Sequence, residues 1–221
     1  MNAGTPQSGA RSDRAAATRE AIMTAAERLF AENGLSAVSH RQISDAAGQR
    51  NVTAVSYHFG SKTDLVRAIM TRHGEPVDLI RHRYAAEAEG SEDVRVWVGA
   101  LVRPVTEHLA SLGVPSWNAR LSAQVMTDPQ MRALTVEEAL HRPYLRQILD
   151  GLGRCLAHLP AEVRAARGDM ARHLIIHVCA DRERALAEGS ALLHGSWEKT
   201  ADALTDAIFG LLTAPTTASR P

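Results

Sequence analysis

Aromatic residues are scarce in this chain of 221 residues: Trp, Tyr and Phe occur three times each and together make up 4%. Hydrophobic residues nevertheless amount to 45%, which argues against global disorder. The core must therefore be built mainly from Ala, Leu, Val and Ile, a composition that favours packed helices. The length fits one large domain or two small ones.

Cysteine is rare as well, and long apolar runs are missing. Cys155 and Cys179 form neither a CxxC motif nor a disulfide framework, which fits a reducing cytosol. No apolar run approaches the roughly 18 residues that a membrane span needs, and the N-terminus MNAGTPQSGARSDR lacks the apolar region of a secretory signal. We therefore expect a cytoplasmic protein with disordered tails at residues 1–14 and 214–221.

The formal net charge is zero, but the charges are unevenly distributed. Residues 11–72 contain nine Lys and Arg residues against six Asp and Glu residues, whereas residues 73–221 contain sixteen against nineteen. A basic N-terminal part on an acidic body predicts a polyanionic partner for the N-terminal part alone. An architectural DNA protein tends to be strongly basic overall, so the zero total argues against that class.

Helical periodicity dominates the chain, with no convincing alternating strand pattern. The segment TREAIMTAAERLFAENG predicts a helix that ends at Gly34. Ser61 is a suitable cap for a long helix that Gly74 and Pro76 are expected to kink or interrupt. Further amphipathic helices are predicted at about 77–89, 92–110, 115–126, 129–158, 161–187 and 196–213.

Two short helices separated by a tight turn are predicted between these longer ones. Ser39 and Gln42 form a capping box for a helix that starts at His40. Gly48 ends this helix, and Asn51 is a good N-cap for a helix over residues 52–59. A helix, a tight turn and a second helix form the arrangement that places the second helix in the major groove of DNA. Because one short helix reads too few bases for useful specificity, we expect a homodimer.

Three segments of this region resemble the N-terminal DNA-binding domain of the TetR family of bacterial transcriptional regulators. They are TREAIMTAAERLFAENG, RQISDAAG and above all YHFGSKTDLVRAIM. The resemblance implies an all-α protein, with a three-helix helix-turn-helix DNA-binding domain at 15–73 and a helical ligand-binding and dimerisation domain at 74–213. It also implies a repressor that a small-molecule effector releases from a palindromic operator in double-stranded DNA. The family's usual turn is one residue shorter than the turn in this chain.

The residues expected to contact DNA follow from helix position and from the resemblance. Val52 or Ala54 can contact a thymine methyl group, and Thr53 can hydrogen-bond a base or a phosphate. Tyr57 and His58 can donate to phosphates, as the family's equivalents do; taken alone, residues of these types are more often ordinary half-buried residues. The full expected set is Arg41, Arg50, Asn51, Val52, Thr53, Ala54, Ser56, Tyr57, His58 and Lys62, in which Lys62 is a phosphate clamp. Phe59 is expected in the core.

Two further residue sets are expected in the C-terminal body. The large side chains expected to line a ligand pocket are Trp97, Leu101, Trp117, Leu121, Met126 and Tyr144. Apolar stripes for pairing the last two helices with those of a second copy contain Leu174, Val178, Leu204, Ile208 and Leu211. For both sets, packing into the core of one chain remains the alternative.

Other chemistries receive less support from the sequence. His173 and His177 have a spacing that can chelate a metal, but no third ligand stands at a diagnostic position, so we expect no metal and no other cofactor. A regulator that senses metal or redox state, or that responds to no ligand, remains the alternative. An enzyme fused to a DNA-binding module is disfavoured, because the chain has no nucleophile motif, phosphate loop or metal triad.

Overall fold

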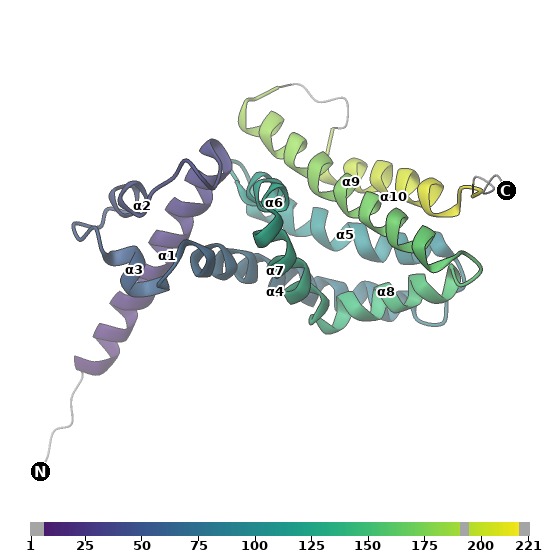
Figure 1. Ribbon diagram of the computed structural model, residues 1–221, viewed down its shortest axis with the longest axis horizontal. Coiled ribbons are helices and arrows are strands. Elements are labelled where there is room, and N and C mark those ends of the chain that lie inside the picture. Colours follow the sequence, from purple (N-terminus) through teal and green to yellow (C-terminus); the bar gives the residue numbers. More distant parts are fainter. Residues whose placement is uncertain (1–6, 191–194, 217–221) are drawn as a thin grey trace, which may run out of the picture. The chain divides into compact units, whose positions relative to one another are not determined.

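The computed structural model describes residues 7–190 and 195–216, and in these ranges it contains helices and no strand (Figure 1). The helices are α1 (Gln7–Asn33), α2 (His40–Ala46), α3 (Ala54–Phe59), α4 (Lys62–Ala88), α5 (Val94–Leu112), α6 (Asn118–Thr127), α7 (Pro129–Leu140), α8 (Pro143–Cys155), α9 (Ala161–Ala187) and α10 (Trp197–Thr213). The chain divides into two compact units, Met1–Thr71 and Arg72–Pro221. The predicted all-α class is confirmed. No helix of the described residues is long and apolar enough to cross a bilayer.

The first unit has a small apolar core to which each of its helices contributes. Its fully buried side chains include Ile22, Ala26 and Phe30 of α1, Ile43 of α2, Val55 of α3, and Leu65, Val66 and Ile69 of α4. As predicted, Gly34 ends α1: its φ is +85°, and its N–H donates to the carbonyl of Phe30 at 2.9 Å. This core holds α2 and α3 in place with the turn between them.

The second unit is a bundle in which α10 packs mainly on α5, and α6 on α9. Trp97 of α5 lies in its core, 1% exposed, with the indole N–H donating to the carbonyl of Ser91 at 2.9 Å. Gly151 of α8 makes room for this ring, since a Cβ atom at that position would lie 2.5 Å from it. The core of the second unit is thus arranged around one buried aromatic side chain and many aliphatic ones.

Several predicted boundaries differ from the structure. Residues 7–14, predicted to be a tail, belong to α1, whereas residues 1–6 and 217–221 of the two predicted tails lie outside the described residues. The single helix predicted over 129–158 is two helices, because Pro143 has no N–H with which to continue α7 and instead starts α8 at its first position.

Gly74 and Pro76 were predicted to kink or interrupt α4. The helix is not interrupted there, and it continues through Pro76 into the segment predicted as a separate helix at 77–89. Burial of Val77, Ala85 and Ala88 on α4 offsets the roughly 3 kcal/mol that an interior proline costs. Gly74 does not mark a helix end either. Its missing side chain leaves the space that the guanidinium of Arg142 occupies.

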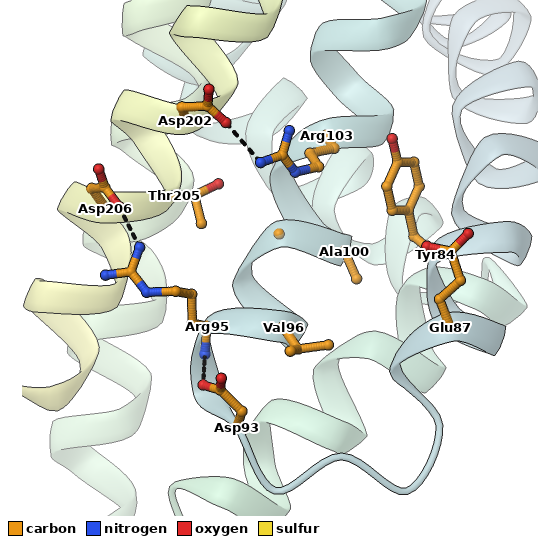
Figure 2. Close-up of a pocket in the computed structure, with 11 residues that line it drawn as sticks. Tyr84, Glu87, Asp93, Arg95, Val96, Ala100, Arg103, Asp202, Thr205 and Asp206 are labelled. Carbon is orange, nitrogen blue, oxygen red and sulfur yellow. Dashed lines mark hydrogen bonds and ion pairs between the residues drawn. The ribbon is translucent and has the colours of Figure 1, made fainter.

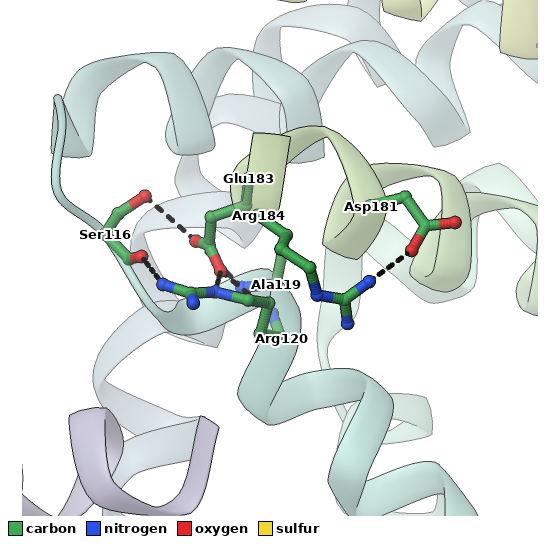
Figure 3. Close-up of polar contacts among 6 residues, drawn as sticks. All are labelled: Ser116, Ala119, Arg120, Asp181, Glu183 and Arg184. Carbon is green, nitrogen blue, oxygen red and sulfur yellow. Dashed lines mark hydrogen bonds and ion pairs between the residues drawn. The ribbon is translucent and has the colours of Figure 1, made fainter. Parts of the chain in front are cut away.

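A buried carboxylate joins α9 to the start of α6 (Figure 3). Glu183 is 2% exposed and accepts hydrogen bonds from Ser116 Oγ at 2.9 Å, Ala119 N at 3.2 Å and Arg120 N at 2.9 Å. The guanidinium of Arg120 also donates to it, through Nε at 3.3 Å. Because α6 has no side-chain cap of its own, Glu183 satisfies the free N–H groups of its first turn.

Candidate functional site

The turn before α3 is organised by one asparagine. Ser39 and Gln42 form the predicted capping box at the start of α2, and Gly48, with φ +67°, lies in the turn. Asn51 Oδ1 accepts hydrogen bonds from Thr53 N at 3.0 Å and Thr53 Oγ1 at 2.7 Å. The helix therefore begins at Ala54, two residues later than predicted, because Asn51 stabilises a turn over residues 52 and 53.

Large side chains are exposed on this helix-turn-helix. Tyr57 is 83% exposed and Val52 is 51% exposed, although both residue types are usually more buried. Five further residues expected to contact DNA are exposed around them, namely Arg41, Arg50, Asn51, Thr53 and Ser56. The arrangement presents an aromatic hydroxyl, an apolar methyl pair, hydroxyls and two guanidinium groups to solvent.

The structure places the remaining three members of the expected set differently. Ala54 is 7% exposed and faces the core, so its methyl group is not available to a thymine. Lys62 is half-buried, and its Nζ donates to the carbonyl of Leu35 at 2.9 Å, which ties the start of α4 to the loop after α1. His58 is half-buried as well.

Sequence reasoning missed two residues that support this surface. Arg19 of α1 donates to the carbonyl of His58 at 2.8 Å, and its guanidinium lies 4.1 Å above the ring of Phe59, which is a core residue as predicted. His40 Nδ1 lies 3.2 Å from Ser56 Oγ and so links α2 to α3. No local sequence motif predicts either contact, because each contact joins residues of two separate helices.

The residues expected at a dimer interface are divided between core and surface. Leu204 and Ile208 are 3% and 0% exposed and belong to the core of their own chain, which corrects their assignment to an interface. Leu174 and Leu211 are half-buried against the same core, and Val178 is 37% exposed. Periodicity identified a buried stripe on α10 but could not show that α5 of the same chain covers it.

A cleft of about 450 Å³ opens in the second unit between α4, α5 and α10 (Figure 2). Two ion pairs join α5 to α10 across it, Arg103 Nη2 to Asp202 Oδ1 at 2.7 Å and Arg95 to Asp206. Gly99 lies between the two arginines in sequence and adds no side chain to the cleft. The other lining residues are Tyr84, Glu87, Asp93, Val96, Ala100 and Thr205.

None of the six residues expected in a ligand pocket lines this cleft. Trp97, Leu121 and Met126 are buried core residues, while Leu101, Trp117 and Tyr144 are half-buried. The ring of Tyr144 packs instead against His82, with 4.6 Å between the ring centroids. Charged and small residues line most of the cleft, together with Tyr84 and Val96.

The two cysteines are buried or half-buried, whereas His173 and His177 are exposed. Both cysteines are free, and burial raises the pKa of Cys179 to about 12, so that its thiol stays protonated and unreactive. His173 and His177 are exposed on α9 with nearly parallel rings. In the described part of the chain, no three His, Cys, Asp or Glu side chains converge into a metal site.

Comparison with known proteins identifies the family. The model for bacterial regulatory proteins of the tetR family matches residues 22–69, and the model for the tetracyclin repressor-like C-terminal domain matches residues 99–210. No curated protein matches the chain.

Solved structures are also similar to the chain. A structure from Mesorhizobium loti MAFF303099, assigned to the TetR-family transcriptional regulators, is 18% identical, with 90% of this chain and 98% of that chain covered and a TM-score of 0.46. A TetR-family regulator from Streptomyces coelicolor A3 is 20% identical, with 90% and 96% covered and a TM-score of 0.38. Because the two family models match segments of both compact units, this chain belongs to the TetR family of bacterial regulatory proteins and is a DNA-binding transcriptional regulator, not an enzyme.

Proposed function

We propose that this regulator is a cytoplasmic repressor that binds a palindromic operator as a homodimer and leaves it when a small molecule binds the second unit. The observation that carries the DNA-binding part is the exposure of Tyr57 and Val52 on α3 and its preceding turn. Tyr57 is 83% exposed, and its hydroxyl is free to donate a hydrogen bond to the DNA backbone.

The proposed contacts are of two kinds. Arg50 and Tyr57 contact the phosphates. Val52 and Thr53 contact the base edges where the start of α3 enters the major groove. Thr53 Oγ1 already donates its proton to Asn51, so its oxygen is left to accept from a base amino group. The half-buried Lys62 supports α4 through Leu35 and is a secondary phosphate contact.

Replacing residues of each kind should separate affinity from specificity. Arg50→Ala should weaken binding to all sequences alike and lower the slope of log K against log salt by about 0.9. Thr53→Ala should cost about 1–3 kcal/mol at the operator and relax discrimination at particular bases. Mobility-shift titrations at several salt concentrations, on an operator located by protection mapping, measure both quantities.

Arg146→Ala provides the matched control, because it removes an exposed arginine from α8 in the other unit. It should leave the operator affinity and the salt slope unchanged. Equal affinity of Arg50→Ala, Thr53→Ala and the parent protein would show that α3 and its preceding turn are not the DNA-reading element.

The exposed sides of α9 and α10 are the proposed dimer surface. Met170 and Val178 of α9 are 53% and 37% exposed, and α10 presents Ala203 and Ala207 on the side that its core stripe leaves free. Pairing two such helices with their mates gives a four-helix interface. A dimer also fits a palindromic operator, because its two recognition helices enter successive major grooves about one turn, roughly 34–36 Å, apart.

The cleft between α4, α5 and α10 is the proposed effector site. Its volume of about 450 Å³ is within the range of small-molecule sites, about 300–1,000 Å³. Four carboxylates line it against two guanidinium groups, so an uncharged or cationic effector is favoured over an anionic one. For release, the effector must bind more tightly to the state that does not bind DNA.

Filling the cleft should weaken the response to the effector and leave DNA binding intact. A Cβ atom at Gly99 would have only Arg103 Nε as a neighbour, at 3.8 Å, so Gly99→Leu should place its side chain in the open space. A compound that releases the parent protein from its operator should then lose more than about tenfold in potency, the usual range of allosteric coupling being about 5–150-fold.

Gly153→Leu is the matched control, since Gly153 is exposed on α8 with nothing within 4 Å of its Cβ position. This variant should respond to the compound as the parent does. If Gly99→Leu also keeps the parent's midpoint, the effector binds elsewhere.

A further inference from the structure

The exposed side of α9 carries two histidines one turn apart. The ring centroids of His173 and His177 are 6.1 Å from each other, and the ring planes differ by 8°. Residues four apart lie one above the other on a helix, so both imidazoles lie on the same exposed face of α9. This is the spacing at which two helical histidines bind one metal ion.

The hydrogen bonding of His173 defines which nitrogen is available. Its Nδ1 lies 2.7 Å from the carbonyl oxygen of Asp169. A carbonyl only accepts, so Nδ1 carries the proton and donates, and in the neutral ring the lone pair resides on Nε2. Metal-binding histidines are oriented in the same manner, with the second nitrogen donating to a backbone carbonyl or a carboxylate.

An ion pair and a thioether lie close to the two histidines on α9. The carboxylate of Asp169, one turn before His173, accepts a hydrogen bond from Arg172 Nη2 at 2.8 Å. Met170 is 53% exposed on the same side and adds a thioether sulfur three residues before His173. Imidazole and thioether donors suit late first-row metals such as Zn²⁺, Ni²⁺ and copper.

One chain supplies too few ligands for a closed site. Structural zinc is bound by four ligands, and no third His, Cys, Asp or Glu joins the pair among residues 7–190 and 195–216. His173 and His177 lie at the middle of α9 (Ala161–Ala187). Where a helix crosses its two-fold mate, the residues near the axis meet their own equivalents in the second copy.

We propose that His173 and His177 of two chains together bind one late first-row metal ion, with Zn²⁺ as the test ion, on the two-fold axis of the dimer. Each chain contributes two Nε2 atoms, and the four imidazoles complete a tetrahedral site. This inference rests on the proposed pairing of α9 with its mate. The bound metal ion adds contacts to that interface, so the dimer dissociation constant depends on the metal concentration.

The test is equilibrium dialysis of the full chain against Zn²⁺, together with sedimentation velocity in Zn²⁺ and in chelator. The parent protein should bind one Zn²⁺ per two chains, and Zn²⁺ should lower the dimer dissociation constant. His173→Asn and His177→Asn should each weaken Zn²⁺ binding by more than about 100-fold, since losing even an outer-shell partner of a ligating histidine costs about 10–100-fold. Helical circular dichroism should stay at the parent's value.

His141→Asn is the matched control. Its Nδ1 also lies 2.8 Å from the carbonyl four residues earlier, that of Glu137, on an exposed helix end. The residues four positions away are Glu137 and Leu145, so His141 has no second imidazole within one turn. This variant should bind Zn²⁺ and dimerise as the parent does.

The possible outcomes distinguish the metal site from the repressor assignment. A dimer that binds its operator but takes up no Zn²⁺ would overturn the metal site and leave the proposed function standing. One Zn²⁺ per chain, with no effect on assembly, would overturn the shared site. A chain that binds its operator as a monomer would contradict both the proposed dimer and the shared metal site.

Discussion

Glu183→Ala is expected to lower the free energy of unfolding by about 3–5 kcal/mol, the usual effect of removing one partner of a buried ion pair. Glu183 is 2% exposed and accepts from Ser116 Oγ and from the backbone N–H groups of Ala119 and Arg120. Its removal leaves those donors without an acceptor. It also leaves the guanidinium of Arg120, whose side chain is 11% exposed, without a counter-charge.

Denaturant titration followed by circular dichroism measures this loss. Asp181→Ala is the matched control, two residues away on the same helix (Figure 3). Asp181 pairs with Arg184 at 2.8 Å, but the two side chains are 75% and 52% exposed, so this change should cost less than about 1 kcal/mol. Glu183→Ala with the parent's midpoint would mean that the start of α6 does not depend on this carboxylate.

Ile208→Glu is expected to prevent folding of the second unit. Ile208 is 0% exposed in the core that α10 forms with α5, and an unpaired carboxylate there costs several kcal/mol. The milder Ile208→Ala should lower the free energy of unfolding by about 2–5 kcal/mol. Soluble yield and helical circular dichroism measure the first change, and denaturant titration measures the second.

Ala207→Glu is the matched change on the exposed side of the same helix. It should leave the unfolding of the single chain unchanged while it weakens the dimer, because two like charges would then meet across the proposed interface. Sedimentation velocity measures the dissociation. A folded, monomeric Ile208→Glu protein would contradict the core position of Ile208 and return this residue to the interface.

The sequence alone determined what depends on neighbours along the chain. The capping box of Ser39 and Gln42 and the glycine stop at Gly34 follow from backbone hydrogen bonding and allowed dihedral angles within a few residues. The TetR resemblance likewise lies in contiguous segments. These local rules placed the helix-turn-helix before any packing was known, with an error of two residues at the start of α3.

Only the tertiary structure decided which apolar stripe meets which partner. Leu204 and Ile208 have the periodicity of an interface and of a core alike, and the distinction came from α5, about a hundred residues earlier in the chain. The location of the cleft could not be predicted either, because an open space is defined by side chains that are missing, such as that of Gly99, between helices distant in sequence. Hydrophobic periodicity reports that a face is buried, but the partner that buries it depends on contacts between helices far apart in the chain.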